Sequence, residues 1–284
     1  MASAHAYTSI LPYLRRYARL LTGNQKAGDV LVVSTLKALV SDPKLVALHR
    51  DSRHVLYRVF LRLWRSPLGD YLGEISNPGG QPSYAESHLA AMSELARPAY
   101  LLVTIEGFTH NEACEILEVS EPDFANLMAL AHRSVSEQLA TDVLIIEDEL
   151  LIAFELEDLM VKLGHHVTSV VRTKRQAVKE AARRRPALIL ADIQLADGSS
   201  GIDAVNEILE SVKVPVIFIT AYPERLLTGL RPEPTFLVTK PFRPEQISAV
   251  VSQALFFNAR AKSKANETQI AEALLSGHGY IYAQ

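Results

Sequence analysis

Five short and almost wholly apolar segments follow Thr141, and they limit the second half of the chain more than any other feature. They are VLIIED, HVTSVV, ALILAD, PVIFIT and FLVTK. Such β-branched runs are typical of parallel strands that are covered on both faces. Amphipathic stretches lie between and after them, around residues 149–163, 174–185, 201–211, 223–229 and 243–257. Five strand–helix repeats predict a doubly wound α/β sheet with its site at the carboxyl ends of the strands.

Charged and polar residues stand where four of these strands are expected to end. Glu147 and Asp148 end the first, Asp192 ends the third, Thr220 ends the fourth, and Lys240 follows the fifth. A carboxylate that accepts a phosphoryl group repels the incoming anion, so a divalent cation and a fixed ammonium group must neutralise it. Three acidic groups suit Mg²⁺, which prefers oxygen ligands. Lysine can pair with a phosphoryl oxygen as a compact charge, and a threonine hydroxyl can donate a hydrogen bond to another.

Residues 141–257 resemble the response-regulator receiver family. The motifs are IIED, LADIQL, FITAY and VTKPF, and the intervals from Asp148 to Asp192, Thr220 and Lys240 in turn are 44, 28 and 20 residues. The resemblance implies a five-stranded flavodoxin-like receiver domain in which Asp192 becomes an aspartyl phosphate. It also implies a histidine kinase or phosphotransfer protein as donor. The metal ligands that it implies are Glu147, Asp148, Asp192 and the backbone carbonyl of Gln194.

The chain departs from the receiver pattern at two positions. Glu147 replaces the more usual aspartate of the acidic pair, which is a conservative change. Leu237 occupies the place where many receivers carry a switching aromatic residue. FITAY resembles a subgroup in which the tyrosine of the motif, here Tyr222, takes part of that role. The alternative for Tyr222 is a half-buried loop aromatic.

The first half of the chain is predicted to be all helical, in two parts. Residues 1–65 carry apolar positions at three- and four-residue spacing. Residues 66–88 are rich in Pro and Gly and are interpreted as a linker. Residues 89–140 include two capping patterns, Thr109 with Glu112 and Ser120 with Asp123, around a tight turn, which indicates a helix-turn-helix shape. The tail, 258–284, has no assigned role.

The two helical parts carry opposite charges. Residues 1–65 hold eleven Lys and Arg against three Asp and Glu, a formal net charge of +8. Residues 66–140 hold two against eleven, a net charge of −9. Segments of such opposite sign can dock on each other within one chain. The stretch that would be the recognition helix offers Arg133 alone, so its acidic surroundings argue against DNA binding.

Residues 1–65 and 89–139 resemble the two conserved helical regions of an extracytoplasmic-function sigma factor. A sigma-like part followed by a receiver resembles the PhyR family of alphaproteobacterial general stress response regulators. The resemblance implies an anti-anti-sigma factor that captures an anti-sigma factor of the NepR type when Asp192 is phosphorylated. The alternative is a phosphorylation-gated sigma-like or DNA-binding regulator that uses basic residues of the first part. These are Arg15, Arg16, Arg19, Arg50, Arg53, Arg58, Arg62 and Arg65.

Composition excludes several other classes of protein. Cys114 is the only cysteine, so no internal disulfide can form, and no Cys/His cluster suggests zinc. No apolar run approaches the roughly 18 residues that a membrane span needs. We therefore expect a cytoplasmic protein with no membrane partner. No nucleophile–base set or nucleotide-binding glycine loop is present, so we expect no enzyme activity beyond its own phosphorylation.

Overall fold

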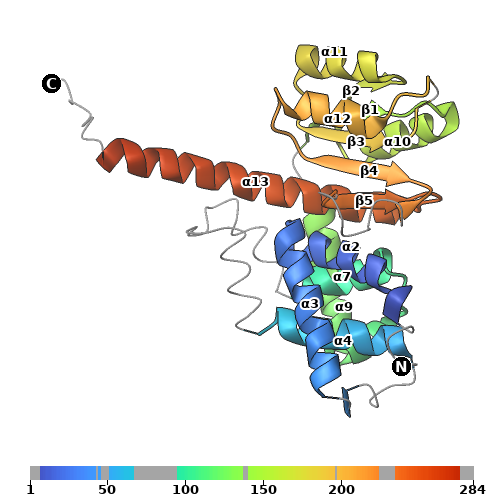
Figure 1. The fold of residues 1–284 in the computed structure, drawn as a ribbon, viewed down its shortest axis with the longest axis vertical. Helices are drawn as coiled ribbons and strands as arrows, with labels where there is room; N and C mark the ends of the chain where they lie inside the picture. The colour runs from blue at the N-terminus through green and yellow to red at the C-terminus, as the bar shows by residue number, and fades with distance from the viewer. Residues whose placement is uncertain are drawn as a thin grey trace.

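The computed structural model describes residues 7–42, 44–45, 51–66, 95–136, 140–195, 197–223 and 234–275. All but the first residue of the expected linker, 66–88, lies outside the described residues. So do nearly all of the short helix expected near 223–229 and the last nine residues of the chain. The described part comprises a helical half and a sheet-containing half, which lie against each other (Figure 1).

The helical half packs its elements around buried aromatic rings. Tyr17, Tyr57 and Phe60 are fully buried, and Tyr17 makes edge-to-face contacts with the other two rings. Three helices come from the first part of the chain and three from the second. They are α2 (Leu11–Thr22), α3 (Gln25–Ser41), α4 (Ser52–Trp64), α7 (Ala96–Thr104), α8 (His110–Leu117) and α9 (Glu121–Ser136).

Both predicted capping patterns form, and they shape the helix-turn-helix. The Thr109 hydroxyl accepts a hydrogen bond from the Glu112 amide, and the Glu112 carboxylate accepts one from the Thr109 amide, so α8 begins with a capping box. The Asp123 amide donates to Ser120 Oγ in the same way at the start of α9. Glu118 ends α8 in the left-handed region, with φ 60°, and turns the chain toward α9.

The second half contains the predicted five-stranded sheet. All neighbouring strands are parallel, in the order β2-β1-β3-β4-β5. The strands are β1 (Asp142–Ile146), β2 (His166–Val171), β3 (Leu188–Asp192), β4 (Val216–Thr220) and β5 (Phe236–Thr239). The helices are α10 (Leu150–Lys162), α11 (Lys174–Arg184), α12 (Gly201–Leu209) and α13 (Pro244–Leu275).

The sheet separates two apolar cores, and successive residues of a strand point alternately into one core or the other. Leu144 and Ile146 face α11 and α12, whereas Val143 and Ile145 face α10 and α13. The second of these cores continues without a break into the core of the helical half. The face of the sheet that α13 covers is therefore the side on which the two halves meet.

The last helix is longer than the sequence predicted. The expected end near residue 257 is wrong, because α13 runs over 32 residues to Leu275 and extends well beyond the body of the molecule (Figure 1). No Gly or Pro interrupts residues 245–275, so nothing in the sequence stops the helix at the edge of the sheet. Neither α13 nor any other described helix has the length and apolar character to cross a bilayer.

Candidate functional site

The carboxyl ends of β1, β3, β4 and β5 bring the predicted site residues together. Glu147 and Asp148 follow β1, Asp192 ends β3, Thr220 ends β4, and Lys240 follows β5. The register places Asp192 beside Ile219, one residue before Thr220. Parallel strands end at one edge of the sheet, so residues separated by up to 93 positions in the chain meet there.

Lys240 is the cation at the centre of this cluster. Its Nζ lies 2.7 Å from Asp192 Oδ2, 2.9 Å from Glu147 Oε2 and 3.3 Å from Glu149 Oε1. Burial by itself would lower the pKa of Lys240, but the hydrogen bond with Asp192 and the charge of Glu147 outweigh it, so the pKa is raised. Lys240 is therefore held as a charged ammonium group against two buried carboxylates.

The environment of Glu147 disfavours the charged form of its carboxyl group. Burial raises its pKa to about 7, and the charge of Asp192 adds to that shift, while Lys240 opposes it. Asp192 is also buried, and its Oδ1 accepts hydrogen bonds from the amides of Ile193 and Gln194 at 2.5 and 3.2 Å. The carboxylates of Glu147 and Asp192 thus lie in one buried site with a single ammonium group, that of Lys240.

The donor set of this site fits a hard divalent cation. One oxygen of each carboxylate of Glu147, Asp148 and Asp192 can be chosen so that all three lie within 4.8 Å of one another. Oxygen ligands of this kind suit Mg²⁺, which needs few protein ligands because it retains water. A cation there would also remove the repulsion between Glu147 and Asp192. The residues present therefore fit a magnesium ion.

Thr220 and Gln194 complete the predicted set. Thr220 is buried, and its Oγ1 accepts a hydrogen bond from the Tyr222 amide at 3.1 Å. Gln194 has an exposed side chain, and its backbone pairs with Ser200 across the loop after β3. That pairing holds the backbone of Gln194 next to Asp192.

Two residues next to the site were not predicted from the sequence. Glu149 reaches Lys240, and its amide donates to Glu147 Oε1 at 3.1 Å. Gly201 begins α12 directly against the backbone of Asp192, where an added Cβ would lie 1.7 Å from the Asp192 carbonyl oxygen. The serine and glycine residues at 198–201 were the only signal that the chain passes so closely there.

The two positions discussed for the switch lie in different environments. Leu237 is buried in the core between the sheet and α12. Tyr222 is 47% exposed in the loop after β4. The exposure of Tyr222 agrees with the expected half-buried loop aromatic, whereas Leu237 is only 1% exposed.

A buried ion pair connects the helical half to the end of β5. Arg16, on α2, lies with its Nη2 2.8 Å from Glu106 Oε1, and its Nη1 donates to Thr239 Oγ1 at 3.4 Å. Tyr57 donates a hydrogen bond to the other oxygen of Glu106 at 2.6 Å. Thr239 directly precedes Lys240, so the interface between the halves begins one residue from the acidic cluster.

A second group of contacts joins α7 to α13. Arg97 Nη2 donates to Gln253 Oε1 at 2.8 Å and to the Leu21 carbonyl at 3.1 Å. Its guanidinium group also lies over the rings of Phe256 and Phe257, 4.4 and 4.9 Å from their centroids. At the other end of α7, Arg243, which directly precedes α13, donates to the Thr104 carbonyl at 3.1 Å. The two halves are thus held by specific polar contacts around an apolar core.

Several basic residues of the first part pair with acids of the second, as their opposite charges predicted. Arg58 and Arg62 contact Glu118, while Arg16 and Arg53 contact Glu106. Two others pair nearer in sequence, since Arg15 and Arg19 both contact Asp29. Arg65 donates to the Leu117 carbonyl, and Arg50 lies outside the described residues. Docking within the chain is confirmed for the residues that the structure describes.

Comparison with known proteins agrees with this architecture. Residues 8–61 match the family model of the Sigma2 domain of PhyR, and residues 89–138 match that of the sigma-like domain of response regulator PhyR. Residues 143–252 match the response regulator receiver domain. The phyllosphere-induced regulator PhyR of Methylorubrum extorquens is 49% identical over 268 residues, which are 93% of this chain and 98% of that protein.

Two solved structures of similar proteins have the same fold. The response regulator PhyR from Brucella abortus is 45% identical with a TM-score of 0.82, over 94% of this chain and 100% of that one. The anti-anti-sigma factor PhyR from Bartonella quintana is 45% identical with a TM-score of 0.81, over 93% and 99%. A co-crystal of PhyR from that organism with the anti-sigma factor NepR is 46% identical over 89% and 98%, with a TM-score of 0.38. This chain belongs to the PhyR family of response regulators, in which sigma-like domains precede a receiver domain.

Proposed function

We propose that this protein is a phosphorylation-activated anti-anti-sigma factor. Its sigma-like half imitates a sigma factor and captures an anti-sigma factor of the NepR type, which frees a stress sigma factor. The relative from Bartonella quintana carries the name anti-anti-sigma factor. The observation that carries the proposal is the contact of Arg16 with Thr239, because it joins the sigma-like half to the residue beside Lys240.

Asp192 is the phosphoryl acceptor in this proposal. A histidine kinase or phosphotransfer protein brings the phosphoryl group, a carboxylate oxygen of Asp192 bonds to phosphorus, and the bond between phosphorus and the donor breaks. The donor keeps the electron pair of that bond. Lys240 and the Thr220 hydroxyl then bind phosphoryl oxygens, because both groups lie at the same edge of the sheet.

The acidic cluster holds Mg²⁺ in this proposal, through Glu147, Asp148, Asp192 and the backbone carbonyl of Gln194. The support is the donor set, since three carboxylate oxygens lie within 4.8 Å of one another. A cation held by these residues would offset the negative charge that accumulates when the phosphoryl group approaches. Lys240 is available for the phosphoryl group only if the carboxylates that it now contacts have another cation.

Phosphorylation opens the molecule by changing what Lys240 contacts. In the closed form its ammonium group lies 2.7 Å from Asp192, and Thr239 next to it accepts a hydrogen bond from Arg16. A phosphoryl group on Asp192 moves the anionic partner of Lys240 outward by the length of the new bonds. The strand end shifts with it, and the contact of Arg16 with Thr239 is lost.

The proposed function corresponds to the following division of the chain into domains. We divide the chain into a sigma-like part (1–65 and 89–140), a linker (66–88), a receiver (141–257) and a tail (258–284), with α13 continuing from the receiver into the tail as far as Leu275. We place the protein in the cytoplasm, where its sigma factor acts. It catalyses nothing beyond its own phosphorylation, and it does not bind DNA, since α9 and its acidic surroundings offer Arg133 alone.

A binding titration tests the proposal. The purified full chain is titrated with an anti-sigma protein of the NepR type, with Mg²⁺ and with or without acetyl phosphate. We expect at least about tenfold tighter binding with the phosphodonor. Asp192→Ala should lose that gain, while the control Asp197→Ala, in the exposed loop after β3, should keep it. Equal binding with and without the phosphodonor, or tight sequence-specific binding to promoter DNA, contradicts the proposal.

A further inference from the structure

Arg172 is a basic residue at the edge of the sheet where the acidic cluster lies. It directly follows β2, whose last residue, Val171, accepts a hydrogen bond from the Glu147 amide at 2.9 Å. The Arg172 side chain crosses to the loop after β1, where its Nη2 donates to the Asp148 carbonyl oxygen at 3.0 Å. The guanidinium group therefore contacts the backbone of a proposed metal ligand.

The start of α11 fixes the backbone of Arg172. Its amide donates a hydrogen bond to Gln176 Oε1 at 3.0 Å. The Gln176 amide in turn donates to Thr173 Oγ1 at 3.3 Å, and this hydrogen bond caps α11. Residue 172 is thus held at this edge of the sheet by β2 on one side and by α11 on the other.

The guanidinium group of Arg172 is available for a further partner. Within the described ranges, this side chain contacts a backbone carbonyl and no carboxylate. It is exposed to solvent. A guanidinium group carries five N–H donors in a planar fork that matches the oxygens of a phosphoryl group. Most of these donors can therefore meet an anion that approaches the site.

The acidic cluster and its rim carry an excess of negative charge. Four carboxyl groups lie at this edge of the sheet, those of Glu147, Asp148, Glu149 and Asp192. When all four are ionised, Lys240 and a divalent cation together supply three positive charges. One negative charge then remains, and it repels the phosphoryl group of the donor. Arg172 supplies the fourth positive charge, so the site is neutral before the anion arrives.

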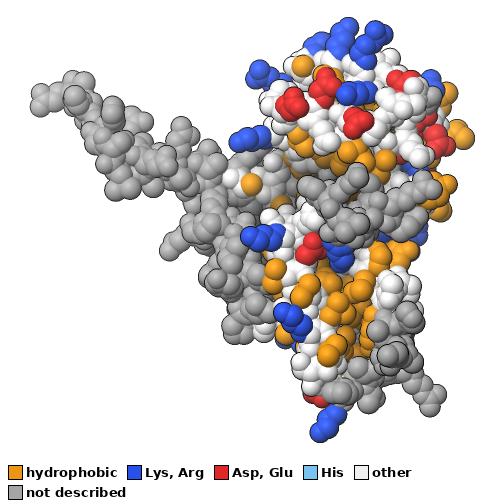
Figure 2. All heavy atoms as spheres, in the orientation of Figure 1, with side chains coloured by type: hydrophobic (Ala, Val, Ile, Leu, Met, Phe, Trp, Pro, Cys, Tyr) orange, Lys and Arg blue, Asp and Glu red, His pale blue; other side chains and the backbone are white. Residues whose placement is uncertain are grey.

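The surface beyond Arg172 is basic as well. Figure 2 shows Lys and Arg side chains gathered over α11, at the top of the sheet-containing half. Five of the 11 residues of α11 are Lys or Arg, and Glu180 is its only acid. A field of one sign around a site raises the rate at which a ligand of opposite charge arrives. Arg172 joins this basic surface to the loop of the acidic cluster.

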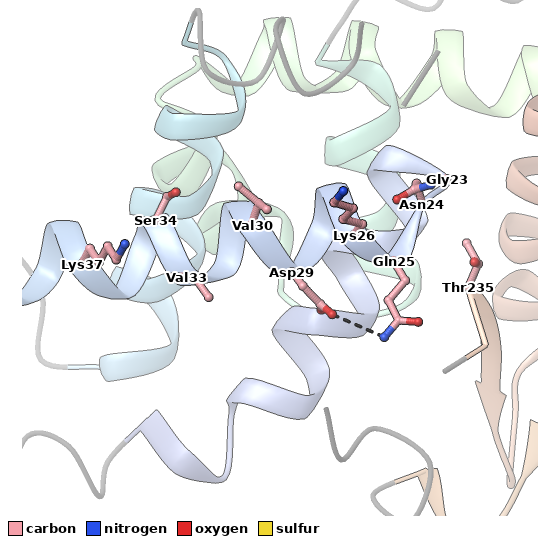
Figure 3. Close-up of a pocket in the computed structure, with 10 residues that line it drawn as sticks. All are labelled: Gly23, Asn24, Gln25, Lys26, Asp29, Val30, Val33, Ser34, Lys37 and Thr235. Carbon is pink, nitrogen blue, oxygen red and sulfur yellow. Dashed lines mark hydrogen bonds between the residues drawn. The ribbon is translucent and has the colours of Figure 1, made fainter. Parts of the chain in front are cut away.

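A second place with exposed lysines does not include the acceptor. A hollow of about 830 Å³ along α3 is lined by Lys26 and Lys37 (Figure 3). Asp29 and Thr235 also line it, and none of its lining residues belongs to the acidic cluster. An anion in that hollow would not lie against Asp192. Lys26 is therefore a suitable control, since it is an exposed cation outside the site.

We infer that Arg172 selects for the phosphoryl group by its charge: the guanidinium group attracts the anionic donor to Asp192 and weakens the binding of a divalent cation by the acidic cluster. The inference rests on the proposed function and names a further residue that determines its substrate class. The two effects are opposite because one fixed positive charge stabilises a neighbouring anion and destabilises a neighbouring cation. Arg172 makes and breaks no covalent bond, so the transfer step remains that between the donor and Asp192.

Arg172→Gln in the full chain tests the charge, because glutamine can still donate a hydrogen bond to the Asp148 carbonyl. One measurement is the acetyl phosphate concentration that half-saturates phosphorylation at saturating Mg²⁺, read on a phosphate-binding gel. The other is the dissociation constant of Mg²⁺ without phosphodonor, from the amide chemical shifts of Ile193 and Gln194. The variant should need about threefold more acetyl phosphate and bind Mg²⁺ about threefold more tightly. Its maximal rate should stay within about twofold of the wild type.

Two further variants separate the charge from the shape of the side chain. Arg172→Lys should restore both wild-type values to within about twofold, because it keeps the charge. Lys26→Gln removes one positive charge outside the site and should leave both values unchanged. Raising the ionic strength should reduce both effects of Arg172→Gln, since salt screens exposed charges.

The outcomes separate this inference from the proposed function. If Arg172→Gln weakens the binding of both ligands, the residue only supports the loop after β1, and the inference is wrong. Values equal to those of the wild type overturn it as well. In both cases the proposed function stands, provided that the wild type is phosphorylated on Asp192. A wild type that acetyl phosphate does not phosphorylate on Asp192 overturns the proposed function and the inference together.

Discussion

Gly23 and Phe257 lie so close together that a side chain on residue 23 would not fit. A Cβ atom built on Gly23 would be 2.4 Å from the ring of Phe257. Gly23 ends α2 with φ 65°, and Phe257 lies on α13, in the receiver half. The turn between α2 and α3 can therefore rest on α13 only because residue 23 has no side chain.

Gly23→Ala should open the molecule without phosphorylation. Overpacking of this kind costs about 1–3 kcal/mol, which is enough to shift a closed state toward an open one by about tenfold or more. We expect the unphosphorylated variant to bind the anti-sigma protein correspondingly more tightly. Gly107→Ala is the control, because Gly107 also has positive φ, at 71°, but its added Cβ would meet nothing within 4 Å. If both variants bind like the wild type, Gly23 does not hold the closed state.

Asp192→Asn should abolish phosphorylation by acetyl phosphate. The amide cannot attack phosphorus, and it pairs more weakly with Lys240 than the carboxylate does. The measurement is retardation on a phosphate-binding gel together with lability of the label to hydroxylamine. Asp203→Asn, on the exposed side of α12, should be phosphorylated like the wild type. Label that remains on the Asp192 variant would place the acceptor elsewhere.

Glu106→Gln should destabilise the sigma-like half by roughly 3 kcal/mol. The change leaves the Arg16 guanidinium group buried with no anionic partner, and breaking a buried pair costs about 3–5 kcal/mol. Urea unfolding of the full chain, followed by circular dichroism, measures the loss. Glu121→Gln, exposed in the first turn of α9, should change the stability by less than about 1 kcal/mol. Equal midpoints for the two variants would show that Arg16 finds another partner.

The sheet and its site could be predicted because both depend on local sequence. Apolar runs specify parallel strands, and the residue that ends each run is placed at one edge by the parallel arrangement. That is why Glu147, Asp192 and Lys240 meet as expected. Gly201 could not be assigned, because its role depends on how closely the chain passes Asp192 after the loop.

Contacts between the halves could not be derived from the sequence. Opposite charge predicted that the basic and acidic segments pair, but not that Arg16 reaches Thr239, 223 residues away. The predicted end of α13 was wrong for a different reason. Residues 258–275 include many good helix formers, such as Ala, Lys, Glu and Gln, and contain neither Gly nor Pro. The boundary was placed where the amphipathic stretch of the receiver ends, although the sequence allows the helix to continue.

Acid should weaken the contact between α4 and the helix-turn-helix. Hydrogen bonds from Arg62 and Arg58 lower the pKa of Glu118 to about 2, against an ordinary value of 4.5. A lowered pKa stabilises the folded state at pH values above 4.5, and this contribution is lost as the pH falls from 4.5 through about 2. Solvent screens the pair, so the contribution is about 1 kcal/mol or less. Unfolding of the wild type and Glu118→Gln should therefore differ at pH 6 and converge near pH 2. A difference that persists at pH 2 would show that the carboxylate is not its source.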